Sequence, residues 1–492
     1  MLLSDEQDAR AMSCAGHAFV RTPHLDRLAA GGTRFTNALT PSPICVPARA
    51  ALATGRWVHD IGCWDNALAY AGAPRGWAHA LRDAGWRVES IGKLHYRDAA
   101  CDSGFGAQHE PLHIAGGIGQ VWGSVREPLP AVRRPTHLFD RLGPGHSAYN
   151  AYDERVAARA AAWLEQRERA SDAAPWALFV GFVAPHFPLV VPPRWLEGID
   201  IDALPLARQH PERGYRRHPW VQRHVDMADP DTELGSDARR RLALACYFGL
   251  VAFLDHQIGR VLGALERCGL ADETLVVFAS DHGDNQGQRG LWNKSTLYRE
   301  SLNVPLILRG PGVPRGHVCT TTANLVDIAP TVLQAAGLPL PPELPGAPLQ
   351  SLANASDDAQ RIGFSEYHAV GSPSAAYALW QGRWAYHHYV GFAPELFDRQ
   401  TDPDQLHDRA ADPSLAPVLR HFEALLRARL DPQAIDRRAK ADQAALVARH
   451  GGPQMALSVG VPGASPVPAV ATDATDAAGA GSAPAGTQPS RT

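Results

Sequence analysis

The segment Glu273–Asp284, ETLVVFASDHGD, joins an unbroken apolar run to two carboxylates and an imidazole. A run of this kind, without alternation of apolar and polar residues, is typical of a strand buried on both faces of a parallel sheet. Open α/β sheets bind ligands beyond the carboxyl ends of their strands. The segment therefore predicts a buried strand that delivers Asp281, His282 and Asp284 to a site at the edge of the sheet.

Three further apolar runs have the same character and predict further strands of a parallel sheet: Arg87–Tyr96, Pro175–His186 and Val304–Gly312. Helical stretches lie between these runs. One extends from a capping residue at Ser236 to Gly269, and a shorter alanine-rich one covers residues 152–168. Strands that alternate with helices predict an α/β fold with a doubly wound, mainly parallel sheet.

The composition changes after about residue 345, which predicts three regions. Residues 1–345 form the catalytic α/β domain, and residues 346–440 form a small C-terminal α+β subdomain. In the second region, ALWQGRWAYHHYV and PELFDRQTD are typical of short antiparallel strands, and SLAPVLRHFEALLRARL is typical of an amphipathic helix. Residues 460–492 are rich in Ala, Pro, Gly, Ser and Thr, so we expect a disordered tail.

Bulk properties exclude several classes of partner. The formal net charge of the 492 residues is −4, which does not favour nucleic acid or an anionic membrane. No uninterrupted apolar run reaches the roughly 18 residues that a membrane-spanning helix needs. The seven scattered cysteines form no CxxC pair, and the acidic start MLLSDEQDAR is unlike a secretory signal, so we expect a cytoplasmic protein. None of these properties excludes a homo-oligomer.

The beginning of the chain is unusual. Only Leu2 and Leu3 precede Asp5 and Glu6, whereas a strand commonly has about five or six residues. We therefore expect either a very short first strand or an encoded start that is slightly too late.

Charged side chains recur at the predicted strand ends. They are Asp5, Glu6, Lys93, His95, His186, Asp281 and His282. Carboxylates with one histidine suit an oxygen-preferring divalent metal such as Ca²⁺, Mg²⁺ or Mn²⁺. The cations Arg49, Lys93 and Lys294 suit an anionic substrate. Each residue alone has a simpler explanation, such as a solvated terminus, a strand cap or a buried thiol, but their recurrence at one end of the sheet favours a site.

Several short motifs occur in the order typical of one enzyme family. They are CVPAR at Cys45–Arg49 followed by TGR, then GKLH, PHFPLVVPPRW, SDHGD, WNKSTLYRESLNVPLILRGPG and LFDRQTDPDQLHDRAADP. Together, from about residue 5 to about residue 415, they resemble the sulfatase family of the alkaline phosphatase superfamily. The pair Asp281-His282 also resembles choline-sulfatase-like members and phosphonate monoester hydrolases. The first motif is highly specific, and the others are strong in series.

The resemblance implies a role for Cys45. In this family a separate formylglycine-generating enzyme oxidises the signature cysteine to an aldehyde, and it reads the proline and arginine that follow. This covalent change alters the chemistry of the position. The hydrated aldehyde then attacks the sulfur or phosphorus centre of a small anionic ester with one hydroxyl, and the second hydroxyl expels the anion.

The resemblance also assigns the other site residues. The metal ligands it implies are Asp5, Glu6, Asp281 and His282, with modified Cys45 at the metal and Ca²⁺ as the favoured ion. It implies that Arg49 holds the aldehyde hydrate and that Asn66 is a substrate contact. The residues that it places around the transferring group, one of them protonating the leaving oxygen, are Lys93, His95, His186 and Lys294. Glu6 stands where many members have Asp, and His282 where many have Asn. The stretch Pro211–Met227 either borders the substrate entrance or is a solvated loop.

Three functions follow as hypotheses. The leading one is hydrolysis of a sulfate ester, and the alternative is hydrolysis of a phosphonate monoester or phosphodiester at the same site. A catalytically silent metal-binding protein is disfavoured because the nucleophile, the arginine and the lysines are all present.

Overall fold

The computed structural model describes residues 1–130, 136, 138–169, 174–460 and 465–468. Its centre is an eight-stranded sheet in the order β11-β2-β10-β9-β1-β7-β4-β5. These strands are β1 (Leu2–Asp5), β2 (Thr33–Phe35), β4 (Arg87–Lys93), β5 (Ala107–Leu112), β7 (Trp176–Pro185), β9 (Val276–Ser280), β10 (Leu306–Arg309) and β11 (His317–Cys319).

The short first strand lies in the middle of this sheet. β1 runs parallel to both neighbours, with Leu2 opposite Val180 of β7 and Phe278 of β9. The four long apolar runs are all strands, but one expectation is wrong. β10 pairs antiparallel with both β9 and β2, so the sheet is mixed, although mostly parallel. An unbroken apolar run reports that both faces of a strand are covered, and it carries no information about strand direction.

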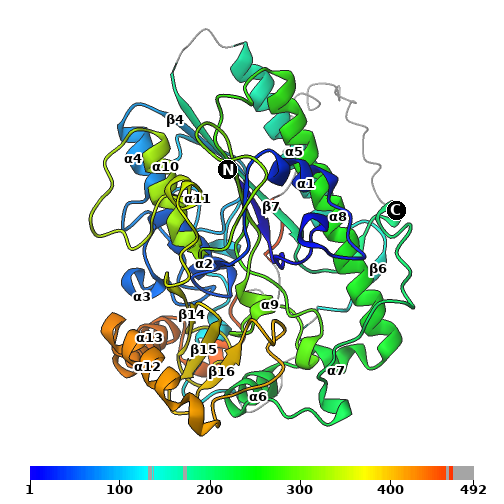
Figure 1. Ribbon diagram of the computed structural model, residues 1–492, viewed down its shortest axis with the longest axis vertical. Coiled ribbons are helices and arrows are strands. Elements are labelled where there is room, and N and C mark those ends of the chain that lie inside the picture. Colours follow the sequence, from blue (N-terminus) through cyan, green and yellow to red (C-terminus); the bar gives the residue numbers. More distant parts are fainter. Residues whose placement is uncertain (131–135, 137, 170–173, 461–464, 469–492) are drawn as a thin grey trace, which may run out of the picture.

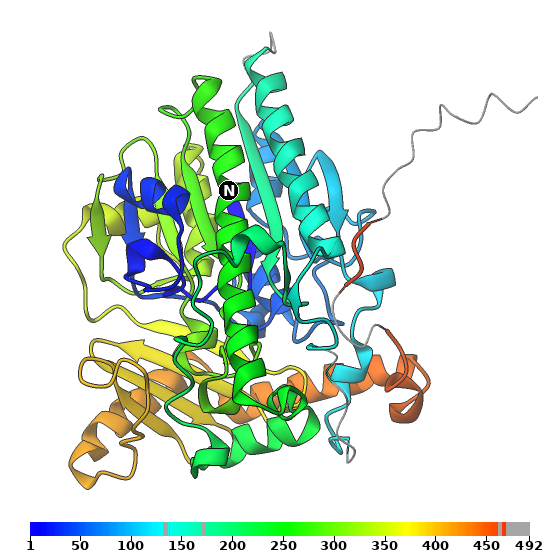
Figure 2. The same cartoon turned by 90° about the vertical axis from the view of Figure 1, so that its right-hand side faces the viewer.

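Alternate residues of each strand point to opposite faces of the sheet. Leu2 packs into a cluster with helices α1 (Pro23–Ala30), α5 (Ala148–Glu168) and α8 (Asp237–Arg267). Leu3 packs into a cluster on the other face, with α2 (Cys45–Thr54), α4 (Trp77–Asp83) and α10 (Ile328–Ala335). Figures 1 and 2 show these two helical layers, with α1, α5 and α8 on one side of the sheet and α4 and α10 on the other.

Helix α8 is the longest helix of the described chain. Ser236 caps it as the sequence predicts, because its hydroxyl accepts a hydrogen bond from the amide of Arg239. In length and mean hydropathy α8 would also be able to cross a membrane, yet 83% of its most apolar window is buried inside the fold. That burial is the packing of a core helix.

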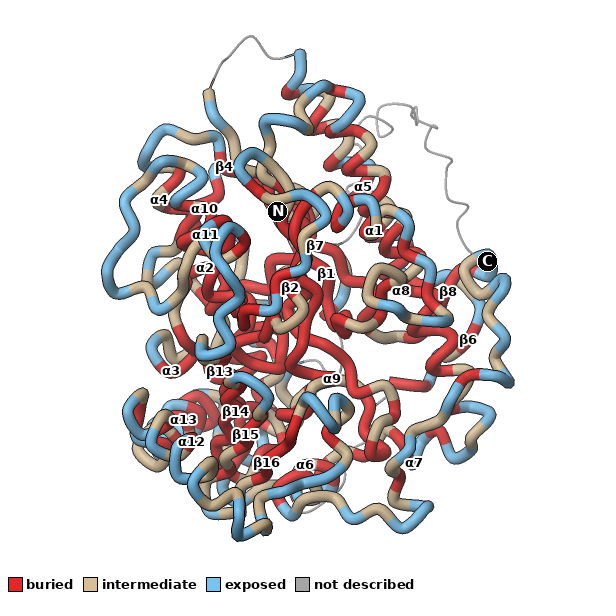
Figure 3. The backbone as a smooth tube through the Cα atoms, in the orientation of Figure 1, coloured by how far each residue is buried: buried red, intermediate tan, exposed pale blue. Residues whose placement is uncertain are grey.

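A separate four-stranded antiparallel sheet lies beyond the carboxyl ends of the parallel strands (Figure 1). Its strands, in the order β13-β14-β15-β16, are Gly363–Tyr367, Ala376–Gln381, Trp384–Tyr389 and Glu395–Asp398. Helices α12 (Ala416–Arg429) and α13 (Pro432–Arg449) contribute to the core on one face, and α6 (Pro219–Met227) to that on the other. The predicted strands and amphipathic helix of this region are therefore present, and β13 joins them. Figure 3 shows that the residues of both sheets are mostly buried and that exposed residues lie mainly in peripheral loops and helices.

Shorter elements complete the described fold. They are β3 (Ala38–Leu39), β6 (Gly143–Pro144), β8 (Val190–Val191), β12 (Ala323–Asn324), α3 (Val58–Ile61), α7 (Pro230–Leu234), α9 (Arg299–Leu302), α11 (Leu349–Asn354) and α14 (Pro453–Ala456).

Most of the predicted tail, residues 461–464 and 469–492, lies outside the described residues. Ser465–Pro468 is described, and Ser465 is only 9% exposed because it packs against the main domain. The disordered tail as a whole stays a prediction.

Candidate active site

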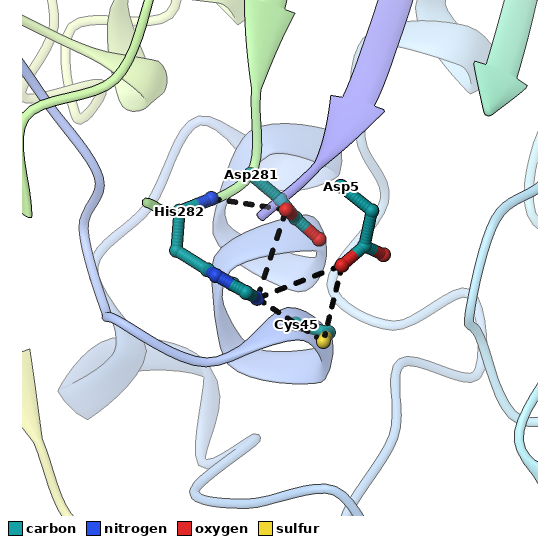
Figure 4. Close-up of side chains that lie close together, drawn as sticks. All are labelled: Asp5, Cys45, Asp281 and His282. Carbon is teal, nitrogen blue, oxygen red and sulfur yellow. Dashed lines mark hydrogen bonds and ion pairs between the residues drawn. The ribbon is translucent and has the colours of Figure 1, made fainter. Parts of the chain in front are cut away.

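Four side chains from three chain segments meet at the carboxyl end of β1 (Figure 4). Asp5 ends β1, Cys45 begins α2, and Asp281 and His282 follow β9 directly. The Nε2 atom of His282 lies 3.2 Å from the Cys45 sulfur and 3.8 Å from Oδ1 of Asp5. All four residues are buried, and their ligand atoms lie within 4.8 Å of one another.

A backbone contact orients the imidazole of His282. Its Nδ1 lies 3.0 Å from the carbonyl oxygen of Gly283, which fixes the proton on Nδ1 as the donor. The Nε2 lone pair then faces Asp5 and Cys45. Metal-binding histidines are commonly oriented by such a second contact.

Arg49 fixes the positions of Asp5 and Asp281 by hydrogen bonds to both carboxylates. It lies one helical turn after Cys45 on α2, so both side chains are presented to the same region. Its guanidinium donates to Asp281 at 2.7 Å, to Asp5 at 3.0 Å and to the carbonyl of Lys93 at 2.8 Å. These three contacts use the rigid fork of the guanidinium to fix three strand ends relative to one another.

Lys93 and His95 come from the end of β4. The Lys93 ammonium lies 2.5 Å from Oδ2 of Asp5. Burial alone would raise the pKa of Asp5, but nearby positive charge, led by Lys93, holds it well below its usual value. Burial and the charge of Lys93 lower the pKa of His95 well below its ordinary range, so His95 is neutral at neutral pH. It adopts a left-handed backbone conformation with φ of 60°.

Glu6, His186 and Lys294 form a neighbouring group. The Lys294 ammonium lies 2.9 Å from Oε2 of Glu6 and 2.8 Å from Nε2 of His186. Nδ1 of His186 lies 2.8 Å from the carbonyl of Phe187, so Nε2 is the acceptor facing Lys294. Burial and Lys294 together lower the pKa of His186 well below its ordinary value. Glu6 therefore contacts Lys294 and lies beside the four-residue cluster.

The residues present fit an oxygen-preferring divalent ion. Asp5, Asp281 and Glu6 offer carboxylate oxygens, and Oε1 of Glu6 is buried without a hydrogen-bond partner among the described residues. Burial raises the pKa of Glu6 to about 8, which reflects how poorly a carboxylate is compensated there without further positive charge. A cation held by Asp5, Glu6, Asp281 and His282 would supply that charge.

The Cys45 thiol is poorly suited to act as a thiolate. Burial, followed by the charge of Asp5, raises its pKa to about 12. At neutral pH the sulfur keeps its proton, and a thiol is a weak nucleophile.

A cavity of about 150 Å³ opens beside Cys45. Arg49, expected to hold the aldehyde hydrate, is not among the residues that line it. Every residue expected around the transferring group does line it, together with Asn66: Lys93, His95, His186 and Lys294. Asn66 also accepts a hydrogen bond from the amide of Val46 at 3.1 Å, which ties the cavity wall to the start of α2. Of the stretch Pro211–Met227, one residue, His224, reaches the cavity.

Sequence patterns did not identify other lining residues. They include Gln120, Trp122, Trp292 and Ser465. Trp122 and Gln120 lie outside the quoted motifs, and Trp292 lies inside one without having been singled out. Ser465 stands in a low-complexity stretch where no pattern distinguishes it from its neighbours.

Comparisons with known proteins agree with this geometry. A family model described as "Sulfatase" matches residues 1–338, and one described as "N-sulphoglucosamine sulphohydrolase, C-terminal" matches residues 287–431. The chain is 30% identical over 474 residues to the choline-sulfatase of Rhizobium meliloti (strain 1021), covering 90% of this chain and 89% of that protein. It is 28% identical over 438 residues to arylsulfatase K of Bos taurus, covering 84% of this chain and 78% of that protein.

Solved structures share the fold. The phosphonate monoester hydrolase of Agrobacterium radiobacter superposes with a TM-score of 0.73 at 24% identity, covering 87% of this chain and 94% of that one. The phosphonate monoester hydrolase SpPMH of Silicibacter pomeroyi gives 0.70 at 23% identity with the same two coverages. These likenesses confirm the predicted alkaline-phosphatase-like architecture. Because the "Sulfatase" model spans more than half of the chain, the chain belongs to the sulfatase family and is a sulfuric ester hydrolase.

Proposed function

We propose that this chain hydrolyses the sulfate ester of a small, uncharged alcohol, with formylglycine made from Cys45 and one divalent ion held by Asp5, Glu6, Asp281 and His282. The observation that carries the proposal is the buried meeting of Cys45 with Asp5, Asp281 and His282 at the mouth of a cavity lined by two lysines. Ca²⁺ is the favoured ion because the donor set is mostly carboxylate oxygen, with Mn²⁺ and Mg²⁺ as alternatives.

Modification of Cys45 replaces its carbon–sulfur bond with a carbonyl. The carbon–sulfur bond and one carbon–hydrogen bond break, water supplies the carbonyl oxygen, hydrogen sulfide leaves, and the two electrons and two protons pass to the oxidant used by the separate formylglycine-generating enzyme. The ion would polarise the substrate, while the hydrated formylglycine would supply one hydroxyl for attack and a second that expels sulfate.

Charged residues around Cys45 would have separate roles in the reaction. Arg49 keeps Asp5 and Asp281 at fixed separation, since it donates to both. Lys93 and Lys294 place positive charge where the sulfate oxygens would lie. Lys294 also carries protons on the cavity side, in contact with neutral His186, and so it is the candidate donor to the departing alcohol oxygen.

The cavity wall suggests the type of alcohol. Its aromatic members are Trp122, Phe187 and Trp292, and among the described lining residues none is a carboxylate. A cationic alcohol would lose its water there with no carboxylate opposite it, beside Lys93 and Lys294, and only the faces of the three aromatic rings would compensate its charge. The small volume also favours a compact leaving group.

A panel of hydrolysis assays tests the proposal, with the holoenzyme produced alongside a formylglycine-generating enzyme. The panel contains a small aryl sulfate, choline sulfate, a phosphonate monoester and a phosphodiester, and Cys45→Ala serves as the inactive control. We expect the highest kcat/KM for the neutral aryl sulfate. Higher kcat/KM for the phosphonate or phosphodiester would replace the proposal with the alternative hydrolase, and choline sulfate as the best substrate would contradict the uncharged alcohol.

The cytoplasmic location also stays a proposal. It is supported by seven cysteines that are all free of disulfides. Fractionation of the producing cell tests it, and recovery of the enzyme outside the cytoplasm would contradict it.

A further inference from the structure

Ser465, the first residue of the short C-terminal segment Ser465–Pro468, lines the cavity that holds Cys45. The side chain of Ser465 lines this cavity and is 9% exposed. Its hydroxyl oxygen lies 2.9 Å from Nε2 of His95, although the two residues are 370 positions apart in the chain. The segment thus touches one of the residues implied in catalysis.

Two further contacts anchor this segment. The hydroxyl of Tyr149, on α5, donates a 2.6 Å hydrogen bond to the carbonyl oxygen of Ser465. Val467 packs against the apolar cluster formed by α5, α8 and the main sheet. Ser465 is therefore held through its backbone as well as its side chain, and its position beside the cavity does not depend on His95 alone.

The orientation of the His95 ring depends on Ser465 more than the position of Ser465 depends on His95. Nδ1 of His95 has no hydrogen-bond partner among the described residues. The contact with Ser465 is then the hydrogen bond that fixes the rotation of the imidazole about its side-chain bonds. The serine hydroxyl can donate to or accept from Nε2, so the contact fixes the orientation of the imidazole with either tautomer.

We propose that Ser465 is a positioning residue for His95 and that it forms part of one wall of the substrate cavity, limiting the size of the leaving alcohol, while Val467 anchors the segment from outside the cavity. The inference rests on the proposed function, because it concerns the same cavity. It assigns a catalytic contribution to a region that composition alone describes as a featureless tail.

Two truncated chains separate this segment from the residues around it. One ends at Pro468, and the other ends at Gly460. The first is the matched control, because it lacks only residues beyond the described segment. We expect the chain ending at Pro468 to match the full chain in kcat and in its preference for a small over a bulky aryl sulfate. The chain ending at Gly460 should lose kcat on the small ester and gain relative kcat/KM on the bulky one. Equal preferences in all three chains would overturn the cavity-wall assignment.

Point variants test the hydrogen bond in the full-length chain. Ser465→Ala should lower kcat by about fivefold to tenfold, the effect of losing one hydrogen bond, with little change in KM or melting temperature. Ser465→Thr, which keeps the hydroxyl, should restore most of the rate. The acid limb of the kcat–pH profile should also shift in the alanine variant alone. Equal kcat in the wild type and both variants would overturn the positioning role.

Hydrogen exchange supplies a readout that needs no turnover, so the fate of this inference and that of the proposed function stay distinguishable. In the chain ending at Gly460, amides of residues 93–96 and 147–150 should exchange faster than in the chain ending at Pro468. Unchanged exchange would overturn the inference even if sulfate hydrolysis is confirmed. Faster exchange would support the contact even if the substrate panel selects a phosphorus ester.

Discussion

Arg49 and Asp281 form an ion pair that is almost completely removed from solvent. The guanidinium nitrogen lies 2.7 Å from the carboxylate oxygen, and the two side chains are 1% and 0% exposed. Breaking a buried pair leaves one charge without compensation, which is more costly than never having had the pair. Since the same guanidinium also contacts Asp5 at 3.0 Å, its loss removes positive charge from two buried carboxylates, of which Asp5 keeps the ammonium of Lys93.

Replacement of Arg49 should therefore affect stability as well as catalysis. We expect Arg49→Met to lower the free energy of unfolding by about 3–5 kcal/mol in metal-free protein, measured by urea denaturation. Arg56→Met is the matched control, because Arg56 pairs with the half-exposed Glu343 and should change stability by less than about 1 kcal/mol. Equal small effects of the two substitutions would contradict the structural role of Arg49.

The metal cluster gives a second prediction. His282→Ala should lower metal affinity by more than about 100-fold, beyond the loss seen when only an outer-shell partner is removed. Asp281→Asn should also abolish metal binding and activity. Both residues follow β9 and face the site, so the far-ultraviolet circular dichroism spectrum should not change. Bound metal is measured by elemental analysis after dialysis, with Asp202→Asn, an exposed substitution away from the site, as the control. Near-normal activity of metal-stripped wild type would contradict the role of the cluster.

The sequence predicts where the site residues lie, but it does not predict the direction of every strand in the sheet. Asp281 and His282 could be placed because an apolar run ends immediately before them, and strand ends converge at one edge of a sheet. The direction of β10 could not be predicted, because an apolar run indicates that a strand is buried and says nothing about the direction in which it runs.

The role of Ser465 was hidden for another reason. Its place in the cavity depends on a contact with His95 across 370 positions and on packing by Val467. Neither contact leaves a local pattern in a stretch of Ala, Pro, Gly and Ser. The contact between Glu6 and Lys294 was likewise invisible, because it is set by how two loops meet beyond the sheet.

A third prediction concerns the junction between the two sheets. Glu366 of β13 accepts a hydrogen bond from the amide of His59 in α3 at 3.0 Å, and its Oε1 lies 2.8 Å from Nδ1 of that histidine. Burial alone would raise the pKa of Glu366, but His59 and His368 hold it far below its usual value, while Glu366 raises the pKa of His59 despite burial.

The sign of the pH dependence follows from these shifts. A lowered carboxyl pKa stabilises the fold above the unfolded-state value of about 4.5, and this contribution is lost as the pH falls through the folded value. A raised histidine pKa stabilises the fold below about 6.5, and this contribution is lost as the pH rises through the folded value. Glu366→Gln should thus destabilise by about 3–5 kcal/mol, with the largest effect between these limits. Glu343→Gln, at an exposed pair, is the control, and a loss that does not vary with pH in denaturant titrations would contradict the ion pair.

The last prediction concerns Cys45 itself: activity should follow the aldehyde content of this position, not its thiol content. The pKa of about 12 leaves almost no thiolate at neutral pH, and a sulfur-bound product would need a separate water for release. A hydrated aldehyde contains both the attacking oxygen and the group that expels the anion. The tryptic peptide that begins after Arg34 and ends at Arg49 should be lighter in active enzyme, because oxygen replaces sulfur and two hydrogens, and it should react with a hydrazide probe. Preparations with graded conversion should show kcat proportional to the hydrazide-reactive fraction. Cys45→Ala should be inactive, and Cys45→Ser should retain at best weak activity toward phosphodiesters. Full sulfatase turnover by protein whose Cys45 is shown, by alkylation of a separate sample, to be entirely a free thiol would refute the aldehyde mechanism and leave Cys45 as an ordinary metal-bound or buried cysteine.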